Sequence, residues 1–141
     1  MIDLLDVNLW LALVDQRHLH HPVARAYWSQ NGDRQFAFCR VTMLAFLRLI
    51  TSHKAVANPK KNAAAWSIYQ EFKALPNIRF LTEPPHLETS FHSLTAVADL
   101  PNRMWTDAYL AAFALASGSR LVSFDADFSS FPGIQFLHLK P

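Results

Sequence analysis

Short apolar runs alternate with stretches of helical periodicity along the whole chain. Runs rich in Leu, Ile, Val and Phe predict buried strands at residues 2–5, 36–39, 78–81, 121–123 and 134–139. Apolar residues recurring every three or four positions predict helices at residues 9–16, 21–30, 42–53, 60–75, 86–98 and 106–117. Strands that alternate with helices are typical of an α/β fold in which helices cover both faces of a mostly parallel sheet.

The turn signals and the length of the chain predict one domain. Asn31-Gly32 and Pro84-Pro85 break the periodic pattern, and Gly118 follows the last predicted helix as a C-terminal cap. The 141 residues are 51% hydrophobic, which is enough for one packed core, and they contain no repeat or linker. We therefore expect a single domain over residues 1–141.

Composition narrows the class of protein only modestly. The net charge of +2 and the pI near 8.9 are compatible with a polyanionic substrate without indicating one. Charged residues make up 17% and aromatic residues 13%, so some apolar surface is expected to remain for a protein partner. The single cysteine, Cys39, excludes an internal disulfide framework and a cysteine-rich zinc site, as expected for a cytoplasmic protein. No run approaches the ~20 apolar residues of a membrane span, and no basic leader is present.

Several aspartates stand next to the predicted strand ends. Asp6 follows the first strand, and Asp125 and Asp127 follow the fourth. Asp107 lies in the first turn of the helix that leads into the fourth strand. Because ligands bind outside the carboxyl ends of parallel strands, these distant segments are predicted to form one acidic cleft.

Crowded carboxylates imply a cation, because their mutual repulsion raises their pKa values unless a positive charge lies between them. Oxygen ligands without a Cys/His set favour Mg²⁺ or Mn²⁺, which can activate water for attack on a phosphodiester. Each aspartate also has a purely structural interpretation. Asp6 or Asn8 can cap the first helix, Asp107 can complement a helix dipole, and Asp125 and Asp127 are common turn residues.

Four segments together resemble one family of nucleases. Residues 4–12 (LLDVNLWLA) are similar to the opening motif of PIN domains, in which asparagine stands two residues after the aspartate. Residues 105–114 (WTDAYLAAFA) and 121–133 (LVSFDADFSSFPG) resemble the C-terminal half of VapC-type toxins, in the same order and at similar spacing. Residues 42–51 (TMLAFLRLIT) resemble one branch of these toxins.

The resemblance implies a PIN fold with a parallel sheet of about five strands and a metal-dependent endoribonuclease, the toxin of a bacterial type II toxin–antitoxin system. It implies that Asp6 and Asp107 are ligands of Mg²⁺ or Mn²⁺, that Asp125 completes the metal site and that Asp127 assists catalysis. The substrate would be an RNA such as a tRNA, rRNA or mRNA. A cognate antitoxin would block the cleft, and the toxin is expected to form a homodimer.

One departure from the family pattern concerns the second metal position. Many PIN nucleases carry a glutamate near the start of the middle helix, where this chain has Met43 and Leu44. Thr42 can contribute a hydroxyl through water or simply cap the helix, and Asp99 can substitute or serve as a loop residue. The missing glutamate also leaves open a catalytically weak module that acts through an antitoxin on operator DNA. A third alternative is another metal-dependent phosphohydrolase.

Overall fold

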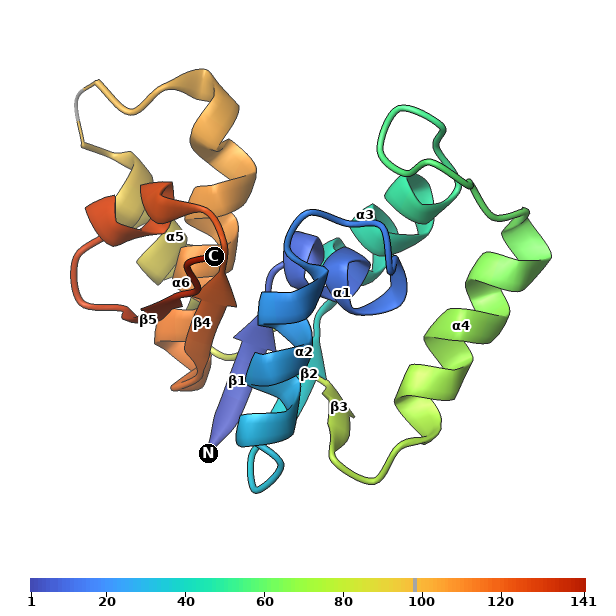
Figure 1. The fold of residues 1–141 in the computed structure, drawn as a ribbon. Coiled ribbons are helices and arrows are strands. Elements are labelled where there is room, and N and C mark those ends of the chain that lie inside the picture. Colours follow the sequence, from blue (N-terminus) through green and yellow to red (C-terminus); the bar gives the residue numbers. More distant parts are fainter. Residues whose placement is uncertain (98) are drawn as a thin grey trace.

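A five-stranded parallel sheet forms the centre of the computed structural model, which describes residues 1–97 and 99–141 (Figure 1). The strand order is β3-β2-β1-β4-β5, and every neighbouring pair is parallel. The strands are β1 (Ile2–Leu5), β2 (Gln35–Phe38), β3 (Ile78–Phe80), β4 (Arg120–Ser123) and β5 (Gln135–His138). The predicted fold class is confirmed, and the central strand, β1, has β2 on one side and β4 on the other.

The helices follow the predicted order. They are α1 (Val7–Val14), α2 (His21–Gln30), α3 (Arg40–Ile50), α4 (Asn62–Ala74), α5 (Leu87–Thr95) and α6 (Trp105–Ser117), with short 3₁₀ helices η1 (Asn102–Met104) and η2 (Ala126–Ser130). The predicted end of the fifth helix at Ala98 lies outside the described residues, and α5 ends at Thr95. None of the described helices is long and apolar enough to cross a bilayer.

Side-chain capping explains why α1 and α3 begin earlier than the apolar pattern predicted. The Val7 N–H donates to Asp6 Oδ1 at 2.8 Å, so α1 begins directly after β1. The Cys39 N–H donates to Thr42 Oγ1 at 2.9 Å, and the Thr42 hydroxyl donates back to the Cys39 carbonyl at 3.1 Å. Thr42 therefore stands at the third position of α3 in a capping box and is not the N-cap residue.

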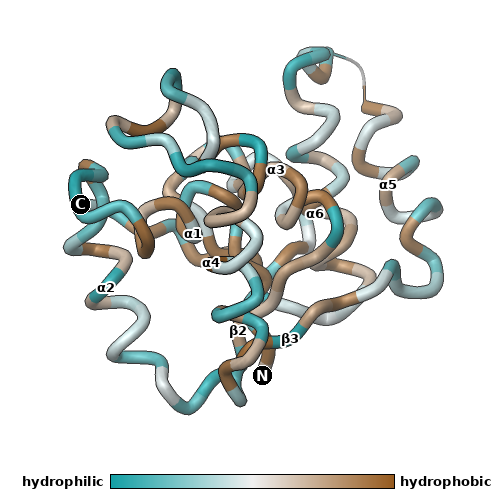
Figure 2. The backbone as a smooth tube through the Cα atoms, turned by 90° about the vertical axis from the view of Figure 1, so that its right-hand side faces the viewer, coloured by the Kyte–Doolittle hydropathy of each residue, from teal (hydrophilic) through white to brown (hydrophobic). Residues whose placement is uncertain are grey.

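The strands divide the apolar residues between two cores because successive side chains point to opposite faces of the sheet. Leu5, Phe38 and Val122 face α1 to α4, whereas Leu4 and Leu121 face α5, α6 and η2. Figure 2 shows the hydrophobic stretches of α1 and α6 near the middle of the molecule and more polar segments around them. Both faces of the sheet are thus covered, which fixes the strand ends that carry the predicted aspartates.

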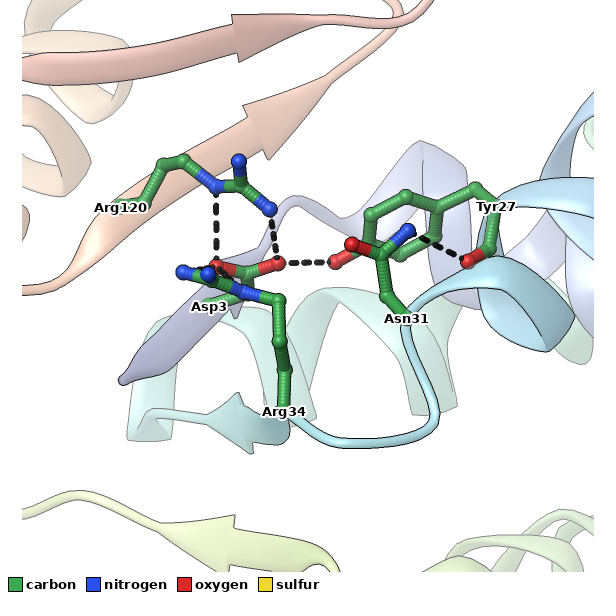
Figure 3. A network of polar contacts seen from close by, with 5 residues as sticks. All are labelled: Asp3, Tyr27, Asn31, Arg34 and Arg120. Atoms are coloured by element: carbon green, nitrogen blue, oxygen red, sulfur yellow. Dashed lines mark hydrogen bonds and ion pairs between the residues drawn. The ribbon is translucent and has the colours of Figure 1, made fainter.

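A buried carboxylate anchors the amino end of β1 (Figure 3). Asp3 is fully buried and accepts two hydrogen bonds from the Arg120 guanidinium at 3.0 and 2.8 Å. Arg34 Nε donates to the same carboxylate at 2.8 Å, and the Tyr27 hydroxyl donates to it as well. Burial alone would raise the pKa of Asp3, but the hydrogen bonds from Arg120, Arg34 and Tyr27 outweigh it and lower this pKa. The network joins β1, β4, α2 and the loop before β2. It lies at the amino ends of the strands, whereas Asp6 lies at the carboxyl end of β1.

Candidate functional site

Asp6 and Ser123 are hydrogen-bonded to each other at the carboxyl ends of the neighbouring strands β1 and β4. The Asp6 N–H donates to the Val122 carbonyl at 3.0 Å, which extends the β1–β4 ladder to the strand terminus. The Ser123 hydroxyl then donates to Asp6 Oδ2 at 2.7 Å, and Ser123 is fully buried. With Oδ1 held by Val7, both carboxylate oxygens of Asp6 have fixed positions. The structural interpretation of Asp6 as a helix cap is therefore correct, and it is compatible with a second role.

Asn8 and Ser123 connect the Asp6 segment to the loop that carries Asp125. Asn8 Nδ2 donates to Ser123 Oγ at 3.1 Å, and the Asp125 N–H donates to the same oxygen at 3.0 Å. Asn8 Oδ1 lies 3.5 Å from the Phe124 nitrogen. One serine hydroxyl thus fixes Asp6 and the start of the Asp125 loop at the same time.

Asp107 interacts with the other three predicted aspartates. Its pKa is raised to about 6, first by partial burial and then by the negative charges of Asp6, Asp125 and Asp127. The pKa of Asp6 is also raised, mainly by burial and further by Asp125, against the lowering effect of the Ser123 and Val7 hydrogen bonds. The four aspartates therefore share one electrostatic environment, although they come from three distant segments of the chain.

Asp127 lies at the more exposed side of this acidic cluster. Its N–H donates to Asp125 Oδ1 at 2.9 Å, which is the turn geometry expected of an aspartate at this position. Its carboxylate Oδ2 accepts a hydrogen bond from Arg103 Nη1 at 3.1 Å. The positive charge of Arg103 in turn lowers the pKa of Asp107, against the effect of the three carboxylates.

The residues near the expected glutamate position provide no carboxylate. Met43 is buried in the core and Leu44 is exposed on α3. The Thr42 hydroxyl accepts from the Cys39 N–H and donates to the Cys39 carbonyl, so it serves the capping box of α3 as the third residue of the helix. Asp99 is exposed in a left-handed backbone conformation, with φ at 73°, as is common for a loop aspartate.

The donor set suits a hydrated cation better than a closed cage. Among the residues that the structure describes, no three Asp, Glu, His or Cys side chains converge closely enough to enclose an ion. Mg²⁺ binds through one or two carboxylates and keeps several waters, so a closed cage is not required. Burial, and after it the charges of the neighbouring carboxylates, raises the pKa of Asp107, and a divalent cation would neutralise the negative charge of these carboxylates. Asp6 and Asp107, with Asp125 beside them, are therefore the candidate ligands of such an ion.

Two side chains of the site were not singled out from the sequence. Ser123 is only the last residue of a buried strand, and nothing in the local pattern indicates that its hydroxyl links Asp6, Asn8 and Asp125. Arg103 stands in a loop with a turn signal at Pro101-Asn102. Its proximity to Asp127 depends on how η1 and η2 pack around α6. Both roles rest on contacts between segments far apart in the sequence.

A groove of about 420 Å³ lies beside the acidic cluster, between the segment before η1 and the segment around η2. Asp127 contributes to its lining, together with apolar residues that include Leu94, Met104 and Phe131. Ser129 and Ser130 also line the groove, and their hydroxyls donate to the backbone carbonyls of Ala126 and Asp127. The groove thus reaches the acidic cluster at Asp127, whereas Asp6, Asp107 and Asp125 are not part of its lining.

Similarity to known families and proteins extends over most of the chain. The PIN domain family matches residues 4–134. The chain is similar to ribonuclease VapC41 of Mycobacterium tuberculosis, with 36% identity over 140 residues covering 94% of each protein. It is also similar to ribonuclease VapC38 of the same organism, with 32% identity over 127 residues covering 87% of this chain and 84% of that protein. Both relatives are named as ribonucleases.

Solved structures share the fold at low sequence identity. One is VapBC2 from Rickettsia felis bound to a DNA fragment from its promoter, with a TM-score of 0.71 and 14% identity, covering 99% of this chain and 100% of that chain. Another is the sarcin–ricin loop cleaving toxin VapC20 of Mycobacterium tuberculosis, with a TM-score of 0.69 and 17% identity, covering 94% and 98%. A DNA-bound VapBC from Salmonella typhimurium has a TM-score of 0.68 and 15% identity, covering 98% of each chain.

Proposed function

This chain belongs to the PIN domain family and is a ribonuclease of its VapC toxin group, and we propose that Asp6, Asp107 and Asp125 form its Mg²⁺- or Mn²⁺-dependent active site. Asp127 assists at the same site. The protein hydrolyses RNA phosphodiester bonds as an endonuclease. Residues 1–141 act as one PIN domain.

One observation carries the assignment of the site. The pKa of Asp107 is raised to about 6 by burial and by three further aspartates from two other segments of the chain. A structural cap or turn residue does not require this concentration of negative charge, which destabilises the protein without a cation. Asp6 is held by Val7 and Ser123, so its carboxylate is pre-positioned at the strand end.

The chain's own residues bind, orient and hold charge at this site. A bound divalent cation supplies polarisation of the phosphodiester and activation of water. Ser123 fixes Oδ2 of Asp6, and Asn8 holds the serine in turn, so the Asp6 carboxylate keeps its orientation during the reaction. Asp107, ionised above about pH 6, provides the second negative charge toward the cation. Asp125 fixes the local turn by accepting the Asp127 N–H.

Water is the nucleophile in the proposed reaction, and this determines the products. The water oxygen bonds to phosphorus while the bond from phosphorus to the 3′ oxygen breaks. One proton of the water is released, and the leaving 3′ oxygen gains a proton. The products carry a 5′-phosphate and a 3′-hydroxyl. Chemical analysis of the new ends distinguishes this route from attack by the ribose 2′-hydroxyl, which would leave a cyclic phosphate.

A cleavage assay with matched variants tests the assignment. The purified chain is incubated with a panel of tRNA, rRNA and mRNA fragments in Mg²⁺ or Mn²⁺, with EDTA as the metal-free control. We expect Asp6→Asn and Asp107→Asn each to lose more than about 100-fold of the activity, since even residues that only support ligands cost about 10–100-fold. Glu71→Gln removes an exposed carboxylate on α4 and should keep full activity. Metal-independent cleavage, or full activity in Asp6→Asn, contradicts the proposal.

A protein partner is the second part of the proposal. The similar structures include VapBC complexes from Rickettsia felis and Salmonella typhimurium, both bound to DNA. We infer that this chain also binds a cognate antitoxin, which blocks the cleft, and that it forms a homodimer. Co-expression with the neighbouring small gene, followed by light scattering and a cleavage assay, tests both points. A monomer that retains full activity in the presence of that protein contradicts them.

A further inference from the structure

Arg103 places a positive charge beside the four aspartates. Its Nη1 donates to Asp127 Oδ2 at 3.1 Å, and its charge lowers the pKa of Asp107. The Arg103 side chain is 67% exposed and the Asp127 side chain is 44% exposed. The guanidinium therefore lies in contact with both the acidic cluster and the solvent from which a substrate approaches.

The backbone at Arg103 is better fixed than the side chain. The neighbouring Met104 is buried in the core that α6 shares with α5, and its N–H donates to the Pro101 carbonyl at 2.9 Å. These contacts hold η1 directly before the start of α6, so that Arg103 precedes Asp107 by four positions in the sequence. The long arginine side chain extends from this fixed point. It can leave Asp127 without any rearrangement of the fold.

The Arg103–Asp127 pair has little value as a stabilising contact. An exposed ion pair contributes about 0–1 kcal/mol, because water screens both charges and two side chains lose freedom. The hydrogen bond to Asp127 engages Nη1, whereas a guanidinium carries five N–H donors in a planar fork. Donors therefore remain for a second anion. Arginine matches phosphate oxygens in geometry and can donate two parallel hydrogen bonds to them.

An RNA strand has an electrostatic difficulty at this cleft. Four carboxylates repel each phosphate, and one divalent cation offsets only part of that charge. A fixed positive charge at the edge of the cluster attracts the backbone and holds it in register. We propose that Arg103 binds an RNA phosphate next to the bond that is cut, and that Asp127 holds the guanidinium in the free enzyme. This inference rests on the proposed function, because it assumes that the aspartates are the active site.

The salt dependence of RNA binding tests a phosphate contact directly. Binding of a short single-stranded RNA is measured with Ca²⁺ in place of Mg²⁺, between 50 and 300 mM KCl as a rough range that spans physiological salt, and a gel confirms that the RNA stays uncut. Each phosphate contact contributes about 0.7 to the slope of log K against log salt for single strands. We expect Arg103→Gln to reduce this slope by about 0.7 and Arg103→Lys to keep most of it.

Arg79→Gln is the matched control. Arg79 is also an exposed arginine with one hydrogen bond, at 3.2 Å to Gln35 Oε1, but Gln35 begins β2 and so lies at the amino end of the sheet. Both substitutions remove one positive charge, so a general effect of net charge would change both slopes equally. Equal slopes for the two variants would overturn the inference. A slope loss confined to Arg103→Gln supports it.

Further measurements separate this inference from a structural role and from the proposed function. The Arg103→Gln variant should raise KM for RNA by about tenfold, while its melting temperature and its affinity for Mn²⁺ change little. If the salt slope is unchanged and only the Mn²⁺ affinity changes, Arg103 acts on the aspartates alone and the inference is wrong. If the wild-type chain fails to cut RNA in Mg²⁺ or Mn²⁺, the proposed function fails first. Cleavage by the wild type together with equal behaviour of the Arg103→Gln and Arg79→Gln variants contradicts this inference only.

Discussion

The Ser123 hydroxyl donates to Asp6 Oδ2 at 2.7 Å, although the two residues are 117 positions apart in the sequence. This hydrogen bond joins the ends of β4 and β1. The same hydroxyl oxygen accepts from Asn8 and from the Asp125 N–H. Because Ser123 is fully buried, none of these groups can exchange the serine for bulk water without opening the site. The orientation of Asp6 therefore depends on the hydroxyl of a buried residue on the neighbouring strand.

Replacing this serine should reduce both the activity and the stability of the protein. Ser123→Ala leaves a buried carboxylate oxygen and an amide without their shared partner, which costs about 1–3 kcal/mol of unfolding free energy. We expect kcat to fall about 10–100-fold, as for other residues that orient ligands. Ser129→Ala, which removes an exposed hydroxyl on η2, should leave both properties unchanged. Urea unfolding and RNA cleavage, measured on the same preparations, decide the point, and a fully active Ser123→Ala enzyme would refute it.

The raised pKa of Asp107 predicts a pH-dependent stability for the metal-free protein. Because its pKa rises from the usual 3.8 to about 6 in the folded state, the folded protein holds this proton more tightly than the unfolded chain. That contribution is fully present below about pH 3.8 and is lost as the pH rises through about 6. In EDTA, Asp107→Asn should therefore melt at a higher temperature than the wild type at pH 7.5, with the difference shrinking toward pH 4.

Addition of Mg²⁺ should reverse this order at pH 7.5, because ionised carboxylates gain a partner in the wild type but less so in Asp107→Asn. Melting curves with and without Mg²⁺ across pH 4–8 provide the measurement. If the melting temperature of the wild-type protein changes with neither pH nor Mg²⁺ in this range, the proposal that the acidic cluster binds a cation is contradicted.

The Asp3 network predicts a different kind of variant, one that damages stability and spares chemistry. Asp3→Asn leaves Arg120 and Arg34 without their carboxylate, which should cost about 3–5 kcal/mol, as for other broken buried ion pairs. Since hydrogen bonds lower the pKa of Asp3, its contribution is present above about pH 3.8 and is lost as the pH falls through the lower folded-state value. Mn²⁺ affinity should stay at the wild-type value wherever the variant is folded. A loss of less than about 1 kcal/mol in urea unfolding would show that the arginines find other partners.

Much of this fold could be predicted from the sequence because most elements carry their own boundary signals. Asn31-Gly32 ends α2 at the predicted residue, and Gly118 takes a positive φ of 69° at the end of α6. The starts of α1 and α3 were displaced because their caps depend on side-chain contacts of Asp6 and Thr42 that the apolar pattern does not contain. Hydrophobic periodicity thus predicts which segments form helices and strands better than it predicts the residue at which each helix begins.

The site was predictable only in part. The rule that ligands bind at the carboxyl ends of parallel strands predicts that Asp6 and Asp125 lie at one site. The role of Asp107 at that site was predicted from the resemblance to a family. Ser123, Arg103 and the Asp3 network depend on packing between distant segments, and no local spacing indicates such contacts. The glutamate expected from the family pattern has no counterpart at Met43 and Leu44, because neither residue carries a side-chain oxygen.

Calorimetric titration of Mn²⁺ into the metal-free protein at pH 7.5 tests the central claim most directly, because it measures binding apart from any RNA. The wild type and Glu71→Gln should bind Mn²⁺ with the same affinity, whereas Asp6→Asn and Asp107→Asn should each bind at least about tenfold more weakly. Circular dichroism must show that all four proteins are folded. Equal Mn²⁺ affinity in all four would contradict a metal site built from Asp6 and Asp107.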